Sequence, residues 1–288
     1  MLVYPLEHEL DKPYILRINE IKNSFPAHRH NFLEFSYIIS GSGVEIINGR
    51  KHCLQKGTFT LLLPYQVHEI HPDDNNIIRL YNCNLSLEIF FGQDKYSEEL
   101  NEMIFRTDEN LPPYVDFDQR NILKVESILL DVYNESREKN ILWRNLLFKS
   151  KLIELFVLFD RERHSNKKNK GSTSSCNIEG DKPSKNYLWK VIFYIHNHYM
   201  EDIGLTELAE YFGISPAHLS TSFKEYFGEN IHSFLNGIRI KHACGLLASS
   251  DKQIIDIASE VGFNSYATFS RVFRQKQGIS ASEYKNKG

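Results

Sequence analysis

A duplicated unit in the C-terminal third of the chain constrains its fold more than any other feature. The segment 205–214 reads LTELAEYFGI and the segment 254–263 reads IIDIASEVGF, with alanine and glycine at the same spacing and an apolar residue after the glycine. Further matches follow each copy: Leu219, Phe223 and Gly228 after the first, and Phe269, Phe273 and Gly278 after the second. Because the apolar residues recur every three to four positions, the segment predicts two related helical units.

Each copy has the residues expected of a helix-turn-helix. The alanine leaves room for a second helix to pack closely, and the glycine permits the sharp turn that follows. Ser215, with Pro216 after it, is expected to cap the next helix in the first copy, and Asn264 is expected to do so in the second. Two helix-turn-helix units in tandem are therefore predicted.

The second helix of each unit has one apolar face and one polar face. Phe269, Val272 and Phe273 share the apolar face in the second copy, so the opposite face can enter the DNA major groove, where arginine binds guanine and serine or threonine binds base edges or phosphates. An ordinary solvated helix surface is the alternative, and the duplication argues against it. The predicted DNA-binding residues are Ala217, Ser220, Thr221 and Lys224 in the first copy and Tyr266, Ala267, Ser270, Arg271 and Arg274 in the second.

The stretch 205–285 resembles the double helix-turn-helix domain of AraC/XylS-type transcription regulators, through Ile238-Arg239 and Leu246-Leu247 in the connecting segment and the later run Phe269-Ser270-Arg271. This resemblance implies binding to double-stranded DNA, with two recognition helices roughly 34 Å apart in successive major grooves and a connecting helix from about 231 to 249. Two residues depart from the family pattern: Ala281 stands where proline is common, and Lys285 stands where arginine is common.

The N-terminal half reads as short β-strands followed by helices. Between residues 32 and 84, apolar runs such as FLEFSYIIS and FTLLL are separated by turn signals, among which Asn48-Gly49 is a strong hairpin signal. Apolar residues at helical spacing then predict two amphipathic helices, 117–137 and 141–162. The predicted fold class is a two-domain α+β protein: an N-terminal β-barrel or jelly roll with two helices, and a C-terminal all-α double helix-turn-helix.

A change in composition separates these two halves. Lysine, asparagine, serine and glycine crowd residues 164–186, so this segment lacks the apolar surface needed to order itself. We therefore expect a sensor and dimerisation domain at 1–163, a flexible linker at 164–186 and a DNA-binding domain at 187–288. A mobile surface loop inside one domain is the alternative, and the length of the segment argues against it.

The run His28-Arg29-His30 with Glu34, and the later His68, resembles the paired motifs of the cupin barrel. In metal-binding cupins the equivalent residues hold one divalent ion, and these ligand types suit Fe, Mn, Ni or Zn. AraC-type sensor domains of this appearance often keep such residues without metal, around a small-molecule pocket. We expect an organic effector, most simply a sugar, rather than a metal cofactor; a divalent ion on His28, His30, Glu34 and His68, or purely structural histidines, are the alternatives.

The predicted effector-binding residues are His28, His30, Glu34, Tyr37 and His68. The barrel interior is expected to be lined by Phe32, Tyr37, Ile39, Phe59, Leu61 and Tyr81, with ordinary core packing as the alternative for each. Resemblance to AraC-type regulators also implies a homodimer formed through the two predicted helices. The alternative is that both helices are fully used in packing on their own barrel.

Charge and terminal sequence limit the partners further. The formal net charge is −3 at pH 7, and the segment 187–288 has as many acidic as basic residues, which predicts modest nonspecific affinity for DNA. No leader-like pattern and no apolar run of bilayer length occurs, so we expect a cytoplasmic protein with no membrane partner.

These observations together predict a sequence-specific, ligand-responsive DNA-binding regulator that is not an enzyme. A cupin metal-binding sensor or metalloenzyme with an accessory helical domain is the alternative. Apart from the histidines and Glu34, the N-terminal half supplies no clear general base and no clamp for a substrate carboxylate, which argues against an enzyme.

Overall fold

The computed structural model describes residues 2–4, 14–30, 32–86, 89, 95–105, 111–138, 142–169 and 187–286. The chain divides into two compact units, Met1–Ser184 and Lys185–Gly288, which are described separately. Among the described helices, none is both long enough and apolar enough to cross a membrane.

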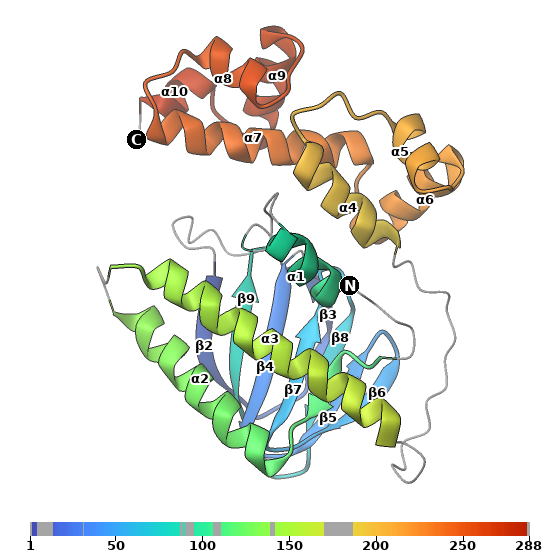
Figure 1. Ribbon diagram of the computed structural model, residues 1–288, viewed down its shortest axis with the longest axis vertical. Coiled ribbons are helices and arrows are strands. Elements are labelled where there is room, and N and C mark those ends of the chain that lie inside the picture. Colours follow the sequence, from blue (N-terminus) through green and yellow to red (C-terminus); the bar gives the residue numbers. More distant parts are fainter. Residues whose placement is uncertain are drawn as a thin grey trace. The chain divides into compact units, whose positions relative to one another are not determined.

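The N-terminal unit is built on two five-stranded sheets (Figure 1). The first has the order β1 (Leu2–Tyr4), β3 (Phe25–His30), β8 (His68–Pro72), β5 (Gly43–Ile47) and β6 (Arg50–Leu54). The second has the order β10 (Tyr114–Asp116), β7 (Thr58–Leu62), β4 (Leu33–Ser40), β9 (Ile78–Leu85) and β2 (Tyr14–Ile21). The predicted β-sheet domain is therefore confirmed, as a sandwich of two sheets.

The predicted hairpin at Asn48-Gly49 joins β5 to β6. Ile47 pairs directly with Arg50, and the two residues between them both have positive φ, 50° for Asn48 and 83° for Gly49. Asparagine and glycine are the residues that adopt this left-handed conformation most readily, so the turn closes the hairpin without strain.

The second sheet sends alternate side chains to opposite sides. Phe35 of β4 and Phe59 of β7 meet α3 (Arg144–Asn169) through Phe156 and Phe159, with ring centroids 6.1 Å and 5.3 Å apart. Because the side-chain period of a strand is two, the intervening residues point to the other sheet. The fully buried core of the unit thus lies on both sides of this sheet.

This alternation corrects the predicted interior lining. Tyr37 is fully buried, but its hydroxyl donates to Oε1 of Glu126 on α2 (Gln119–Arg137), so it faces the helices and not the space between the sheets. Phe59, Leu61 and Tyr81 lie on the same side, since each is paired in register with Phe35 or Tyr37. The prediction that Tyr37 belongs to the effector site was wrong, because it is the residues on either side of Tyr37 in the strand that face the space between the sheets.

Two helices cover the outer face of the second sheet, and a third, α1 (Lys95–Phe105), was not predicted. Figure 1 shows α2 and α3 crossing this face side by side. The α2 helix begins at the N-cap Asp118, whose side chain accepts a hydrogen bond from the backbone N–H of Asn121. The helices predicted at 117–137 and 141–162 thus correspond to α2 and α3.

The α3 helix continues to Asn169, so residues 164–169 of the predicted linker are helical. Within the predicted linker, the first glycine is at position 171, and the lysines before it are good helix formers. The polar composition of residues 164–169 therefore led to a predicted helix end that is too early. The rest of the predicted linker, 170–186, lies outside the described residues.

The C-terminal unit consists of seven helices within its described residues. They are α4 (Tyr187–His198), α5 (Leu205–Tyr211), α6 (Pro216–Phe227), α7 (Ile231–Ser249), α8 (Ile254–Glu260), α9 (Tyr266–Gln277) and α10 (Ala281–Lys285). The pairs α5–α6 and α8–α9 are the two predicted helix-turn-helix units, and α7 has the bounds predicted for the connecting helix. Figure 1 shows α7 as the long helix of this unit, in orange.

The recognition helices begin at serine and end at glycine. Ser215 caps α6 as predicted, whereas α9 is capped by Ser265, not Asn264, with its side chain accepting from the backbone N–H of Thr268. Serine and asparagine are equally good N-caps, so the choice between adjacent residues depends on the turn. Gly228 and Gly278 then end the helices in the left-handed conformation, at φ 80° and 75°.

The glycines of the two turns differ in how closely the chain approaches them. A Cβ at Gly262 would lie 2.7 Å from the carbonyl oxygen of Met200 and 3.0 Å from Nε of Arg239. Arg239 is itself held there, donating through Nε to Tyr199 O and through Nη2 to Glu201 O, both at 2.7 Å. At Gly213 no atom lies within 4 Å of such a Cβ.

This difference predicts unequal costs for the same substitution. Both glycines have positive φ, 66° at Gly213 and 91° at Gly262, so alanine at either costs about 1–2 kcal/mol of conformational strain. Gly262→Ala adds a clash with backbone and with a hydrogen-bonded arginine, so we expect a total of about 3 kcal/mol or more. Urea denaturation followed by circular dichroism measures both variants, and equal losses of stability would contradict the packing argument.

Candidate DNA-recognition helices and a buried histidine cluster

The α9 helix presents a basic surface opposite its buried face. Phe269, Val272 and Phe273 are buried, which places the predicted DNA-binding residues of this helix on the outer side. Tyr266, Ala267, Arg271 and Arg274 are exposed and Ser270 is half-buried. Together with Gln275, these residues line one open hollow, and no residue of that lining is acidic.

The α6 helix has the same arrangement with less charge. Leu219 and Phe223 are buried, whereas Ala217, Thr221 and Lys224 are exposed and Ser220 is half-buried. Lys224 is the only full positive charge among the residues predicted to read DNA from this helix. The exposed His218, in the first turn, was not predicted; it lies on the same helix end, where its Nδ1 is 3.2 Å from the hydroxyl of Tyr187.

Both recognition helices pack against α7, which fixes their separation. The 19 residues of α7 correspond to about 28 Å of helix, a length comparable to one turn of DNA, roughly 34 Å. A connecting helix of this length is of the order of the separation that two helices need to enter successive major grooves.

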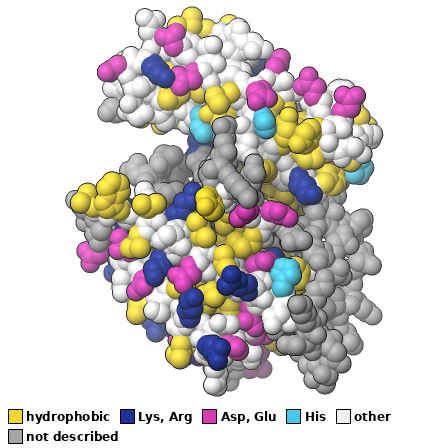
Figure 2. Space-filling view, in the orientation of Figure 1, with side chains coloured by type: hydrophobic (Ala, Val, Ile, Leu, Met, Phe, Trp, Pro, Cys, Tyr) yellow, Lys and Arg dark blue, Asp and Glu magenta, His cyan; other side chains and the backbone are white. Residues whose placement is uncertain are grey.

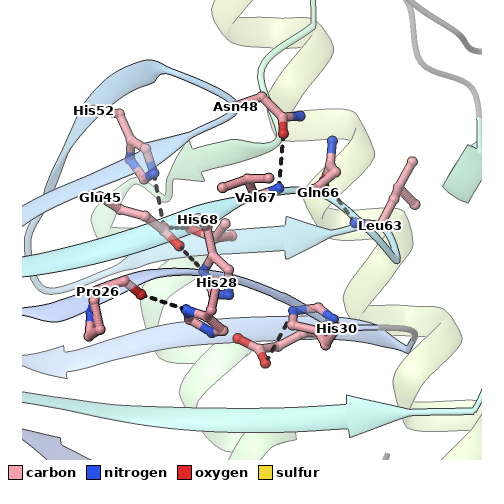
Figure 3. Close-up of polar contacts among 12 residues, drawn as sticks. Pro26, His28, His30, Glu45, Asn48, His52, Leu63, Gln66, Val67 and His68 are labelled. Atoms are coloured by element: carbon pink, nitrogen blue, oxygen red, sulfur yellow. Dashed lines mark hydrogen bonds and ion pairs between the residues drawn. The ribbon is translucent and has the colours of Figure 1, made fainter. Parts of the chain in front are cut away.

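A cluster of buried polar side chains lies between the two sheets of the N-terminal unit (Figure 3). His30 comes from β3, His68 from β8 and Glu34 from β4, so both sheets contribute. Nε2 of His30 is 3.6 Å from Oε2 of Glu34, and one ligand atom from each of the three residues lies within 4.8 Å of the others. All three are at most 8 % exposed.

Both histidines point Nε2 into this cluster, and each Nε2 is unprotonated when its ring is neutral. Nδ1 of His30 lies 2.8 Å from the carbonyl oxygen of Phe32, and Nδ1 of His68 lies 3.1 Å from Oε1 of Glu45. Since a carbonyl or carboxylate oxygen can only accept, both Nδ1 atoms donate, and in the neutral ring Nε2 carries the lone pair. Both Nε2 atoms are buried without a hydrogen-bond partner among the described residues.

Glu45 is the buried carboxylate behind His68. It accepts from Nδ1 of His68 at 3.1 Å, from Nε2 of His52 at 3.0 Å and from Oγ1 of Thr60 at 3.1 Å. Burial by itself raises the pKa of Glu45, but the hydrogen bonds from His52 and His68 outweigh it and lower the pKa to about 2. Sequence reasoning missed Glu45 and interpreted His52 as a surface or satisfied histidine, since no spacing along the chain links them to His68.

The charges of the cluster follow from the same burial. Burial raises the pKa of Glu34 to about 7 and lowers that of His30 to about 3. Burial also acts to lower the pKa of His68, but the hydrogen bond to Glu45 and the charge of Glu34 raise it above its ordinary value. The site therefore holds a neutral His30 beside an ionised Glu45.

The predicted effector residues divide into three groups. His30, Glu34 and His68 meet; His28 is adjacent, with its ring 4.1 Å from that of His68, but its Nδ1 donates to Pro26 O at 3.0 Å; Tyr37 lies on the far side of the sheet. Two imidazole nitrogens with free lone pairs and one carboxylate form a donor set that suits a divalent transition metal such as Fe, Mn, Ni or Zn. The residues present thus fit such an ion through three ligands, without His28.

Two protein families match separate segments of the chain, one segment for each of the two sites. Residues 13–94 match the AraC-like ligand binding domain, and residues 208–287 match the helix-turn-helix domain family. The first contains the histidine cluster and the second contains both recognition helices. The chain belongs to the AraC family of transcription regulators. This is a family of regulators, not of enzymes.

Known relatives are distant in sequence. An uncharacterized helix-turn-helix transcriptional regulator of Staphylococcus aureus (strain COL) is 26% identical over 277 residues, which cover 96% of this chain and 34% of that protein. The chain thus spans about a third of the length of this relative. The transcriptional activator RhaS of Enterobacter sp. (strain 638) is 24% identical over 90% of this chain and 87% of its own length. The crystal structure of ToxT from Vibrio cholerae O395 is 16% identical with a TM-score of 0.38, and the match covers 95% of this chain and 97% of that one.

The two departures from the AraC pattern are accommodated locally. Ala281 is the first residue of α10, where Ser280 and Glu283 form a capping box, so the helix starts without proline. Lys285 donates through Nζ to the carbonyl oxygen of Lys252 at 2.6 Å, which ties α10 to the segment before α8.

Substitutions on the two recognition faces are expected to separate base reading from general attraction. Arg271→Ala removes a side chain able to make a bidentate contact with guanine, so it relaxes selectivity by about 1–3 kcal/mol at one base pair, whereas Lys224→Ala weakens binding to all sequences alike. Fluorescence anisotropy with cognate and scrambled duplexes measures both, and Lys190→Ala, an exposed lysine on α4, is the control. Equal losses on both duplexes for Arg271→Ala would refute its reading role.

Proposed function

We propose that this AraC-family regulator binds a specific DNA sequence as a homodimer under the control of a small-molecule effector held between its N-terminal sheets. The observation that carries the proposal is the exposed face of α9, where Arg271 and Arg274 stand among small and polar residues with no acid in the hollow they line. Such a face is complementary to the edges and phosphates of a major groove.

The two recognition helices have unequal roles in this proposal. On α9, Arg271 and Arg274 bind guanine or phosphate, and Tyr266, Ala267 and Ser270 complete the contact. On α6, Ala217, Ser220, Thr221 and Lys224 contribute position more than selectivity, because only one full charge is present. The domain thus reads one half of its site more stringently than the other.

The effector site is proposed at the cluster of His28, His30, Glu34 and His68. When the rings are neutral, the Nε2 atoms of His30 and His68 can each accept a hydrogen bond. The buried Oδ1 of Asn84, opposite Glu34 in the β4–β9 pair, can accept one too, and none of the three atoms has a partner among the described residues. A cluster of acceptors calls for a ligand rich in donors, and a carbohydrate offers several hydroxyls. A sugar is the effector class we propose.

A second copy of the chain is the proposed occupant of the outer face of the helix pair. Leu123 and Leu130 of α2 are 72% and 51% exposed, and Leu146 of α3 is 65% exposed. Figure 2 shows apolar side chains gathered at the left edge of the N-terminal unit, over the end where α2 meets α3. Leucines repeated seven positions apart on one helix face are typical of helix pairing between copies.

Selection of bound sequences from random DNA, with and without a panel of sugars, tests the regulator and its effector together. We expect two half-sites to be enriched, and an enriched sequence whose affinity changes with one class of sugar. Binding is reciprocal, so the affinity for that sugar must change by the same factor when the DNA is present. An effector affinity that is the same with and without the selected DNA would refute control by that ligand.

The dimer makes a separate prediction. Leu123→Glu combined with Leu130→Glu places charges in the proposed interface, so we expect the dissociation constant to rise at least tenfold, as a few leucine contacts of about 1–2 kcal/mol are lost. Sedimentation equilibrium measures it. Ile255→Glu on α8, where Ile255 is 56% exposed, is the matched control, and unchanged association of the double variant would exclude this face.

A further inference from the structure

We propose that Glu45 is a positioning residue for a divalent-metal site whose ligands are Nε2 of His30, Nε2 of His68 and the carboxylate of Glu34, with His52 and Thr60 holding Glu45 in place. The proposal rests on the effector site proposed above and adds to it regulation by an ion, which occupies the two Nε2 lone pairs in place of sugar hydroxyls and so competes with the sugar at those atoms. It differs from the set of four ligands implied by the sequence, because it leaves out His28 and adds two residues behind the ligands.

The ligand atoms are already convergent and free to bind. The three lie within 4.8 Å of one another, whereas two ligands of one tetrahedral ion with bonds of about 2.1 Å are about 3.4 Å apart. Binding therefore requires side-chain rotations that draw the atoms together by about 1 Å. Neither Nε2 atom has a hydrogen-bond partner among the described residues, although each is buried, and a buried acceptor without a partner is costly unless a ligand satisfies it.

Each histidine is oriented by a group behind it. His30 donates through Nδ1 to the carbonyl oxygen of Phe32, and His68 donates through Nδ1 to Glu45. Carbonyl and carboxylate oxygens are the groups that usually receive the second N–H of a metal-bound histidine, and they fix which nitrogen faces the ion. The carboxylate also makes the imidazole of His68 a better donor to the metal.

Three hydrogen bonds fix the position of the Glu45 carboxylate. Its Oε2 accepts from both Nε2 of His52, at 3.0 Å, and Oγ1 of Thr60, at 3.1 Å, which leaves Oε1 for His68 (Figure 3). The ring of His52 is itself stacked on that of Tyr114, with centroids 3.8 Å apart and an interplanar angle of 6°. Four strands, β5, β6, β7 and β8, thus fix the direction in which Nε2 of His68 points.

His28 marks the limit of the ligand set. It neighbours His68, yet its Nδ1 is bonded to Pro26 O, and its nitrogens do not fall within the group of atoms that converge. Substitution of His28 is therefore the matched control for substitution of His68, since both are buried histidines on adjacent strands of the same sheet.

The test is metal binding by the full chain after treatment with a chelator. Isothermal titration with Zn²⁺, Mn²⁺ and Ni²⁺ is expected to show one ion per chain for the wild type, loss of binding for His68→Ala, and little change for His28→Ala. Glu45→Gln keeps the shape but removes the charge, so its affinity is expected to fall 10- to 100-fold. Thr60→Val, which removes one bond to Glu45, is expected to lower affinity by a smaller factor, and Glu45→Asp to restore part of what Glu45→Gln loses.

A second readout follows the tautomer of His68 directly. Nitrogen-15 NMR of the metal-free wild type, at a pH high enough that the ring of His68 is neutral, is expected to show the proton of His68 on Nδ1, and in Glu45→Gln a mixture of the two tautomers. A role in stability alone would not move the tautomer, and the wild-type spectrum decides the matter even where a variant does not fold. A proton on Nε2 of the neutral ring in the wild type, equal metal affinity for Glu45→Gln and wild type, or an equal loss for His28→Ala and His68→Ala would overturn the proposal.

Failure here is distinguishable from failure of the proposed function. A wild-type chain that binds no ion refutes the metal site but leaves sequence selection and the sugar titration unaffected. A chain that binds the ion but selects no DNA sequence refutes the regulator and leaves the role of Glu45 standing.

Discussion

The two-residue period of the central sheet is the constraint on which the N-terminal unit depends. In β4 and β7, each residue that faces the helices is next to one that faces the opposite sheet, so Phe35 follows Glu34 and Phe59 precedes Thr60. The aromatic residues on one side bury against α3 and supply the hydrophobic stabilisation. That burial holds carboxylates and imidazoles between the sheets, where they would otherwise be costly. The polar site thus exists because the outer face of the same strands is strongly apolar.

In the C-terminal unit, α7 has the corresponding role. Both helix pairs pack on it, and Arg239 anchors it to the end of α4 through two carbonyl oxygens while packing over Phe263. Arg239 belongs to the sequence motif that resembles AraC-type regulators, and its burial and its bonds to backbone carbonyls give it a role in maintaining the fold. Of the exposed residues predicted to contact a duplex, Ala217 and Ser220 recur as Ala267 and Ser270, whereas Thr221 and Lys224 are replaced by Arg271 and Arg274. These two replacements give one scaffold two different surfaces.

The sequence predicted those parts of the fold that depend on local patterns. The duplication located both helix pairs, and α7 occupies Ile231–Ser249, because caps, glycines and helical spacing are all short-range signals. The errors occurred where the local sequence carries no such short-range signal. Tyr37 was placed on the wrong side because a strand of mostly apolar residues has no visible alternation, and Glu45 and His52 were missed because only the pairing of β5 with β6 and β8 brings them to His68.

The same alternation connects the buried cluster to helix α3, because neighbouring residues of β4 and β7 contact the cluster on one face of the sheet and α3 on the other. A ligand can shift a conformational equilibrium only if it binds two states with different affinity, so some element near the cluster must have two arrangements. Glu34 contacts the ligand site and its neighbour Phe35 contacts Phe156 of α3; Thr60 holds Glu45 and its neighbour Phe59 contacts Phe159 of the same helix. Any movement of β4 or β7 that tightens the cluster therefore repacks α3 on the other face of the sheet. In the ligand-responsive regulator proposed above, α3 is the last described helix before the C-terminal unit, so we propose a change in its packing as the link between the cluster and the recognition helices.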